Sequence, residues 1–126
     1  MKRDRKIPDE QYGRIVALVK EAIEEQDFEG DRSEAYNSTE IEVECILIDT
    51  EDECLSVNLT VRCYLDWEDD SFDHEFGTYY DYSWHCEAAE VVDCDGDWEI
   101  MENGEWEVYN PIVDTERISK ELTNLY

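Results

Sequence analysis

The segment LSVNLTVRCYLDW, residues 55–67, decides the predicted fold. Apolar side chains occupy its odd positions and polar side chains its even positions without interruption. Successive side chains of a strand point to opposite faces of a sheet, so this alternation predicts a strand with one buried and one solvent-facing side. The preceding stretch TEIEVECIL, residues 39–47, alternates in the same way. Joined by the acidic turn 49–53, the two stretches predict an antiparallel hairpin over a shared core.

Three further strands are predicted downstream, over residues 76–92, 98–102 and 105–109. The turn-forming sequence DCDGD, residues 93–97, separates the first two. Asn103-Gly104, a strong hairpin signal, separates the last two. One face of the strand 76–92 is assigned to Tyr80, Tyr82, Trp84, Cys86 and Ala88. Residues 68–75 are predicted to form a loop.

A helix is expected at each end of the sheet. Apolar residues recur every three or four positions after Pro8, which predicts a helix over about residues 9–26. A closing helix of about 12 residues, capped by Asp114 or Thr115, would bury Ile118, Leu122 and Leu125. The predicted fold class is therefore α+β: an N-terminal helix, an antiparallel meander sheet of four or five strands and a C-terminal helix. Both helices pack on one sheet face, in a single domain spanning residues 1–126.

The charge of the chain is strongly one-sided. It holds 36 Asp and Glu against 10 Lys and Arg, a formal net charge of -26 on 126 residues, whereas a magnitude of roughly 2 to 8 keeps a small domain soluble. Between Arg32 and Arg117 the one basic side chain is Arg62. We therefore expect an almost purely negative sheet, with the basic residues gathered on the N-terminal helix and the segment before it.

Composition limits the partners and the compartment. Binding to phosphates requires Lys and Arg, so direct nucleic-acid binding is not expected. No stretch approaches the roughly 18 consecutive apolar residues of a membrane span, and no apolar segment follows the basic N-terminus as in a secretion signal. Five cysteines without compact pairs suit reduced thiols in a cytoplasmic protein, with Cys45 and Cys63 buried.

No pattern of residues predicts an enzyme, a cofactor or a metal site. DCDGD resembles a calcium loop, but with Gly96 at the sixth position the first ligand position falls on Val91, so a turn is the better interpretation. His74, His85, Cys86 and Cys94 lack the close ligand pairs of zinc sites. His85 and Cys86 are adjacent on a strand and would point to opposite faces, which argues against a catalytic dyad. Weak divalent-cation binding near Asp93–Asp97 stays open.

The segment 67–84, WEDDSFDHEFGTYYDYSW, interleaves aromatic and acidic residues. Its rings either complete the core or form a recognition surface, because aromatic side chains supply binding energy and charges supply steering. Together with the acidic row of the first hairpin strand, it gives the predicted partner-binding residues. These are Glu40, Glu42, Glu44, Asp66, Glu68, Asp69, Asp70, Phe72, Asp73 and Glu75.

Three explanations of the acidity follow. The first is a nucleic-acid mimic that binds and inhibits a basic DNA- or RNA-binding protein. In charge and size the chain resembles the small acidic anti-restriction and anti-defence proteins of mobile elements. The second is an acidic adaptor or chaperone-like partner of a basic protein without mimicry, and the third is a halophile-type acidic domain. The sequence specifies neither the partner nor the oligomeric state.

Overall fold

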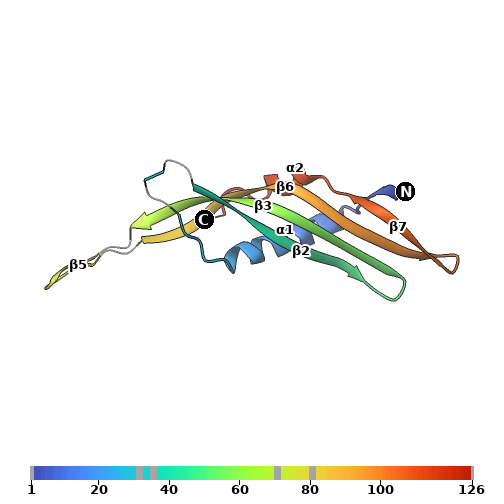
Figure 1. The fold of residues 1–126 in the computed structure, drawn as a ribbon, viewed down its shortest axis with the longest axis horizontal. Helices are drawn as coiled ribbons and strands as arrows, with labels where there is room; N and C mark the ends of the chain where they lie inside the picture. Colours follow the sequence, from blue (N-terminus) through green and yellow to red (C-terminus); the bar gives the residue numbers. More distant parts are fainter. Residues whose placement is uncertain (1, 31–32, 35–36, 70–71, 80–81, 126) are drawn as a thin grey trace.

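The computed structural model describes residues 2–30, 33–34, 37–69, 72–79 and 82–125. A five-stranded sheet in the order β1-β7-β6-β3-β2 forms the body of the molecule, and β4 and β5 form a separate two-stranded sheet (Figure 1). The elements in chain order are β1 (Arg3–Lys6), α1 (Glu10–Glu24), β2 (Asn37–Asp49), β3 (Glu53–Asp69), β4 (Phe72–His74), β5 (Gly77–Tyr79), β6 (Tyr82–Glu102), β7 (Glu105–Ile112) and α2 (Thr115–Lys120).

The predicted central hairpin is confirmed. β2 and β3 pair antiparallel, with Thr39 opposite Cys63 and Cys45 opposite Val57. Odd-numbered residues of β3 from Leu55 to Cys63 are buried, as the alternation predicts. A bulge between Ile46 and Ile48 interrupts the pairing near the turn.

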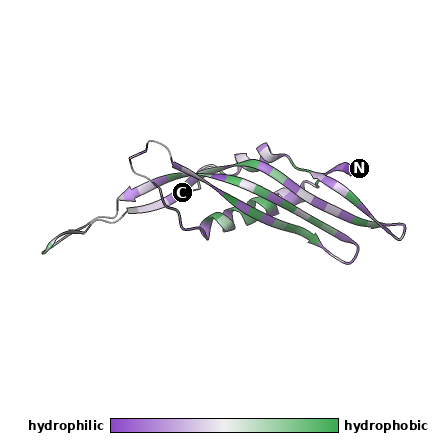
Figure 2. Ribbon diagram, viewed as in Figure 1, coloured by the Kyte–Doolittle hydropathy of each residue, from purple (hydrophilic) through white to green (hydrophobic). Residues whose placement is uncertain are grey.

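One face of the sheet carries the core, and we call it the inner face. α1 lies against it, with Ile15 and Val19 fully buried, which confirms the predicted helix to within two residues at each end. The buried cluster also takes in the two cysteines predicted to be inside, Cys45 and Cys63. Hydrophilic and hydrophobic residues alternate along the strands (Figure 2), so the opposite, outer face carries mainly the hydrophilic ones.

The predicted fold class is wrong. Strands dominate the chain, and the two helices are short. The sheet is mixed rather than an antiparallel meander, because β1, in a segment expected to precede the first element, pairs parallel with β7. Asp114 caps α2 as predicted, but the helix has 6 residues.

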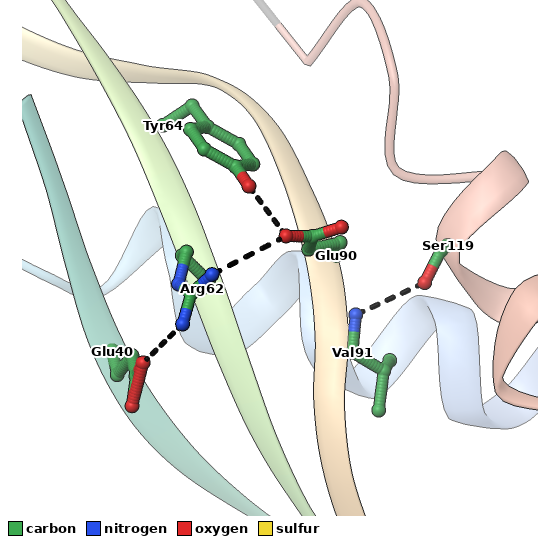
Figure 3. Close-up of polar contacts among 6 residues, drawn as sticks. All are labelled: Glu40, Arg62, Tyr64, Glu90, Val91 and Ser119. Atoms are coloured by element: carbon green, nitrogen blue, oxygen red, sulfur yellow. Dashed lines mark hydrogen bonds and ion pairs between the residues drawn. The ribbon is translucent and has the colours of Figure 1, made fainter. Parts of the chain in front are cut away.

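The two helices touch, with the Arg117 guanidinium 4.1 Å from the centroid of the Tyr12 ring, but α2 lies at a sheet edge rather than over the face that α1 covers. α2 and the residues after it run along the part of β6 that extends beyond β7. The backbone N–H groups of Ala89 and Leu125 donate to the carbonyls of Leu122 and Glu87, respectively. The N–H of Val91 donates to Ser119 Oγ at 3.0 Å (Figure 3). The C-terminal segment therefore covers a sheet edge, while Ile118 and Leu122 still enter the core.

The predicted break at residues 93–97 does not exist. β6 runs unbroken from Tyr82 to Glu102, and Gly96 lies opposite Val57 of β3. A Cβ built on Gly96 would lie 2.4 Å from the backbone oxygen of Ser56, so this glycine permits a close approach of two strands rather than a turn. The hairpin at Asn103-Gly104 is confirmed, with both residues at positive φ.

The predicted facing of the third strand is wrong in its second half. Register shifts opposite Thr60/Val61 and Tyr64/Leu65 leave an extra residue in β6 at each place. Each bulge moves the inward phase by one position. Cys86 and Ala89 are therefore buried, whereas Ala88 is half-buried.

Residues 68–75, predicted as a loop, are partly strand. β3 continues through Asp69, and β4 then pairs with β5. The β4–β5 hairpin extends beyond the end of the main sheet (Figure 1). Tyr80, assigned above to a sheet face, lies outside the described residues.

Candidate functional site

Two rows of carboxylates run along the outer face. Glu40, Glu42 and Glu44 form the row on β2, and all three are exposed. The row on β6 consists of Asp93, Asp95, Asp97 and Glu99, which are exposed as well. Between the rows, β3 presents the neutral side chains Ser56, Asn58 and Thr60.

The pairing register aligns the two rows. Glu42 lies opposite Thr60, which lies opposite Asp93, and Glu44 and Asp95 flank Asn58 in the same way. These four carboxylates line one shallow hollow of about 480 Å³ on the outer face. Strand geometry places charges of one row about 6.6 Å apart and the rows about 9.6 Å from each other. For comparison, the minor and major grooves between the phosphate backbones of B-DNA are about 6 and 12 Å wide.

Arg62 closes one end of this arrangement. Its guanidinium lies 3.1 Å from Glu40 Oε2 on β2 and 3.7 Å from Glu90 Oε1 on β6 (Figure 3). The Tyr64 hydroxyl donates a hydrogen bond to the same Glu90 carboxylate. This bond raises the pKa of Tyr64, because losing the proton would bring two negative charges together.

No ion pair between described residues reaches the middle of the two rows. Lys2 pairs with Asp97 at 2.7 Å, in the half of the β6 row that lies away from Arg62. Among the described residues, no Lys, Arg or His forms an ion pair with Glu42, Glu44, Asp93 or Asp95. The four central carboxylates therefore present their charge to solvent.

The expected separation of basic residues from the sheet is wrong. The basic N-terminal segment forms β1, the edge strand next to β7. Arg5 stacks its guanidinium on Trp98 and Tyr109 at 4.8 and 5.2 Å from the ring centroids. It also lies 3.8 Å from Glu102. One edge of the sheet is therefore basic, and the opposite edge, β2, is acidic.

The structure divides the predicted partner-binding residues into two groups. Glu40, Glu42 and Glu44 belong to the outer face described above. Asp66 and Glu68 are exposed on the last part of β3, and Glu75 is exposed at the β4–β5 turn. Asp69 is in β3 and Phe72 and Asp73 are in β4, while Asp70 lies outside the described residues. The second group leads into the projecting hairpin and does not join the two rows.

The β6 row is the part of the site that sequence reasoning missed. DCDGD was interpreted as a turn because Asp and Gly are typical turn residues. A longer window, DCDGDWEI (residues 93–100), alternates acidic and non-acidic positions and is in fact the pattern of a strand. That alternation was the available signal.

Cys45, Cys63 and Cys94 lie on the inner side of the sheet, whereas the half-buried Cys54 lies on the outer side opposite Glu99. Burial raises the pKa of Cys45 and of Cys94 to about 11; the charges of Asp95 and Asp93 add to the effect at Cys94. The Cys63 thiol is hydrogen-bonded to Cys86 inside the core, which with burial raises its pKa as well. Within the described ranges, no three His, Cys, Asp or Glu side chains are grouped so that they could hold a metal ion. What this face can do chemically is attract and bind cationic groups.

No described helix is both long and apolar enough to cross a membrane. Comparison of the chain with protein-family models, with curated proteins and with solved structures gave no match.

Proposed function

We propose that the protein binds a basic nucleic-acid-binding protein through the two carboxylate rows of its outer face and competes with nucleic acid for that partner. The observation that carries the proposal is the alignment of Glu42 and Glu44 with Asp93 and Asp95 across a neutral strand, with no counterion in the described part of the chain. Like charges held this close repel one another, and a cationic partner relieves that repulsion.

Competition with nucleic acid follows from spacing and charge. Each row presents regularly spaced negative charges, and the two rows lie about 9.6 Å from each other. This distance falls between the two groove widths of B-DNA. Lys and Arg side chains that bind phosphates in a nucleic acid can bind these carboxylates instead. An adaptor without mimicry would use the same charges but would leave the nucleic-acid site of its partner free.

A pair of variants tests the location of the binding surface. The outer-row variant carries Glu42→Gln, Glu44→Gln, Asp93→Asn and Asp95→Asn. The helix variant removes the same number of charges from exposed positions on and next to the helices, through Glu21→Gln, Glu25→Gln, Glu116→Gln and Glu121→Gln. The two proteins therefore have equal net charge and differ in where the negative charge was removed.

The wild type and the helix variant, immobilised in a host lysate, should retain the same basic protein and release it at a few tenths molar salt. The outer-row variant should retain much less of it. Added double-stranded DNA or RNA should displace the retained protein. Equal retention by the outer-row and helix variants, or no basic protein at all, would overturn the proposal; retention that nucleic acid does not affect would identify an adaptor.

A further inference from the structure

The edges of the sheet are treated unequally. One edge is β1, which is 4 residues long and lies next to β7, and the C-terminal segment covers the part of β6 that extends beyond β7. β2 forms the other edge of the five-stranded sheet and is 13 residues long. No hydrogen bond or ion pair joins residues 39–45 to any described element other than β3. An edge strand directs alternate backbone N–H and C=O groups outward, where another strand can pair with them.

The side chains of β2 disfavour pairing with a second copy of this chain and favour pairing with a basic strand. In an antiparallel pair of two β2 strands, Glu40, Glu42 and Glu44 would face carboxylates of the second copy, and like charges directly opposite are destabilising. Opposite charges across two strands are stabilising. The edge therefore disfavours a second copy of the chain and suits a strand with basic side chains.

The protein itself shows how a basic group meets β2. Arg62, on the neighbouring strand and in register with Glu40, reaches that carboxylate at 3.1 Å. Arg14 of α1 donates from Nη1 to the backbone carbonyl of Leu47 at 2.7 Å. Arg14 thus occupies the backbone at the end of β2 near its bulge, whereas no basic side chain of the described residues donates to the backbone of residues 39–45.

We propose that residues 39–45 of β2 accept an extended basic segment of the partner as a sixth strand, with Lys or Arg opposite Glu40, Glu42 and Glu44. This inference rests on the proposed function and adds the form in which part of the partner binds. Backbone hydrogen bonds to the edge hold the segment, and its alternate basic side chains read the glutamate row. The intervening side chains face the side of the sheet that carries Val43 and Cys45.

The probe is a nine-residue peptide of alternating arginine and threonine, blocked at both ends. Two matched peptides carry N-methyl groups, one on the arginine amides and one on the threonine amides. In an added strand only one of these two sets of N–H groups faces β2. Titration calorimetry at low salt should show one methylated peptide binding about tenfold more weakly than the parent, and the other binding about as well. Hydrogen exchange of the outward-facing amides in residues 39–45 should slow when the parent peptide is added.

A matched pair of protein variants tests whether the glutamates of β2 recognise the charge of the peptide. The variant Glu40→Gln, Glu42→Gln and Glu44→Gln should bind the parent peptide about tenfold more weakly. Glu21→Gln, Glu25→Gln and Glu116→Gln remove the same charge from exposed positions on and next to the helices and should weaken binding less than threefold. Equal effects of the two variants would contradict recognition at the β2 edge.

Other results would overturn the inference in identifiable ways. Equal binding by all three peptides, or unchanged exchange in residues 39–45, would mean that no strand is added. A dimer in light scattering whose β2 amides are already protected would assign the edge to a second copy. If any of these results occurs while lysate retention still depends on the outer rows, the edge inference fails and the proposed function stands. If no basic protein is retained from the lysate, the proposed function itself has failed.

Discussion

The inner and outer faces of the sheet are built from the same strands and differ in almost every property. On β3, Leu55, Val57 and Leu59 are 1% exposed or less, whereas Asn58 between them is exposed. The inner face packs against α1, and the outer face carries the two rows of carboxylates. Because side chains alternate, a chain with a net charge of -26 can build a continuous apolar core in which none of the described carboxylates is buried.

Breaking the inner face should have the largest effect. Leu59→Ala removes a side chain that is 1% exposed and leaves a cavity in the middle of the core. We expect the free energy of unfolding to fall by about 2–5 kcal/mol, measured by urea denaturation. Asn58→Ala, the adjacent residue on the outer face, is the control and should change it by less than about 0.5 kcal/mol. Similar losses in the two variants would contradict the division of faces.

Gly96 tests how closely β6 approaches β3. Gly96→Ala places a methyl group against the Ser56 carbonyl and should cost about 1–3 kcal/mol of unfolding free energy, since backbone must move to admit it. Gly13→Ala is the matched change in α1, where nothing lies within 4 Å of the added carbon. It should stabilise the protein by up to about 1 kcal/mol, because alanine is the better helix former. Thermal and urea denaturation of both variants measure the difference, and a neutral Gly96→Ala would show that β6 does not lie so close.

Relieving the charge of the outer face should have a smaller effect of opposite sign. Neutral side chains at Glu42, Glu44, Asp93 and Asp95 should raise the unfolding free energy by about 1 kcal/mol at low salt, because unpaired like charges repel. In 1 M salt, where the screening length is about 3 Å, the gain should vanish. The wild type should remain folded at low salt by circular dichroism. Unfolding of the wild type there would instead favour a halophile-type protein.

The alkylation rate of Cys94 tests the negative charge of the β6 row, and we expect the smallest effect here. Burial, reinforced by Asp95 and Asp93, raises its pKa to about 11, so the reactive thiolate is scarce below that pH and alkylation should be slow at pH 8. Asp93→Asn with Asp95→Asn should shift the rise in alkylation rate of Cys94 to a lower pH. The shift should be modest, because burial remains. Cys45, also near pKa 11 and without these two aspartates among its causes, is the internal control. An unchanged pH dependence of Cys94 alkylation would contradict an effect of Asp93 and Asp95 on this thiol.

The sequence predicted those features that depend on local patterns. The hairpin of β2 and β3 follows from uninterrupted alternation, and α1 from its apolar spacing. Asn103-Gly104 and Asp114 gave a turn and a helix cap because their side chains or backbone preferences act within a few residues. For the same reason the β2 half of the candidate site could be predicted.

The remaining features depend on contacts between distant parts of the chain. β1 consists of four charged residues and has no strand pattern. Each of them pairs with a residue of β7 that lies more than 100 positions further along the chain. The two bulges in β6 shift its phase, so no single alternation describes the strand. Glycine is typical of turns, but Gly96 lies within a strand. The backbone of β3 lies so close to it that only a residue without a side chain fits. The β6 half of the site was missed because its Asp and Gly residues are typical of turns, although residues 93–100 alternate locally as a strand does.

The most direct test of the central claim is the salt dependence of binding to the retained basic protein. The slope of log Kd against log salt should be clearly smaller for the outer-row variant than for the wild type, because fewer ion contacts form. The helix variant, with equal net charge, should keep the slope of the wild type. Equal slopes for the two variants would show that net charge alone drives binding, and would contradict the assignment of the two carboxylate rows as the binding surface.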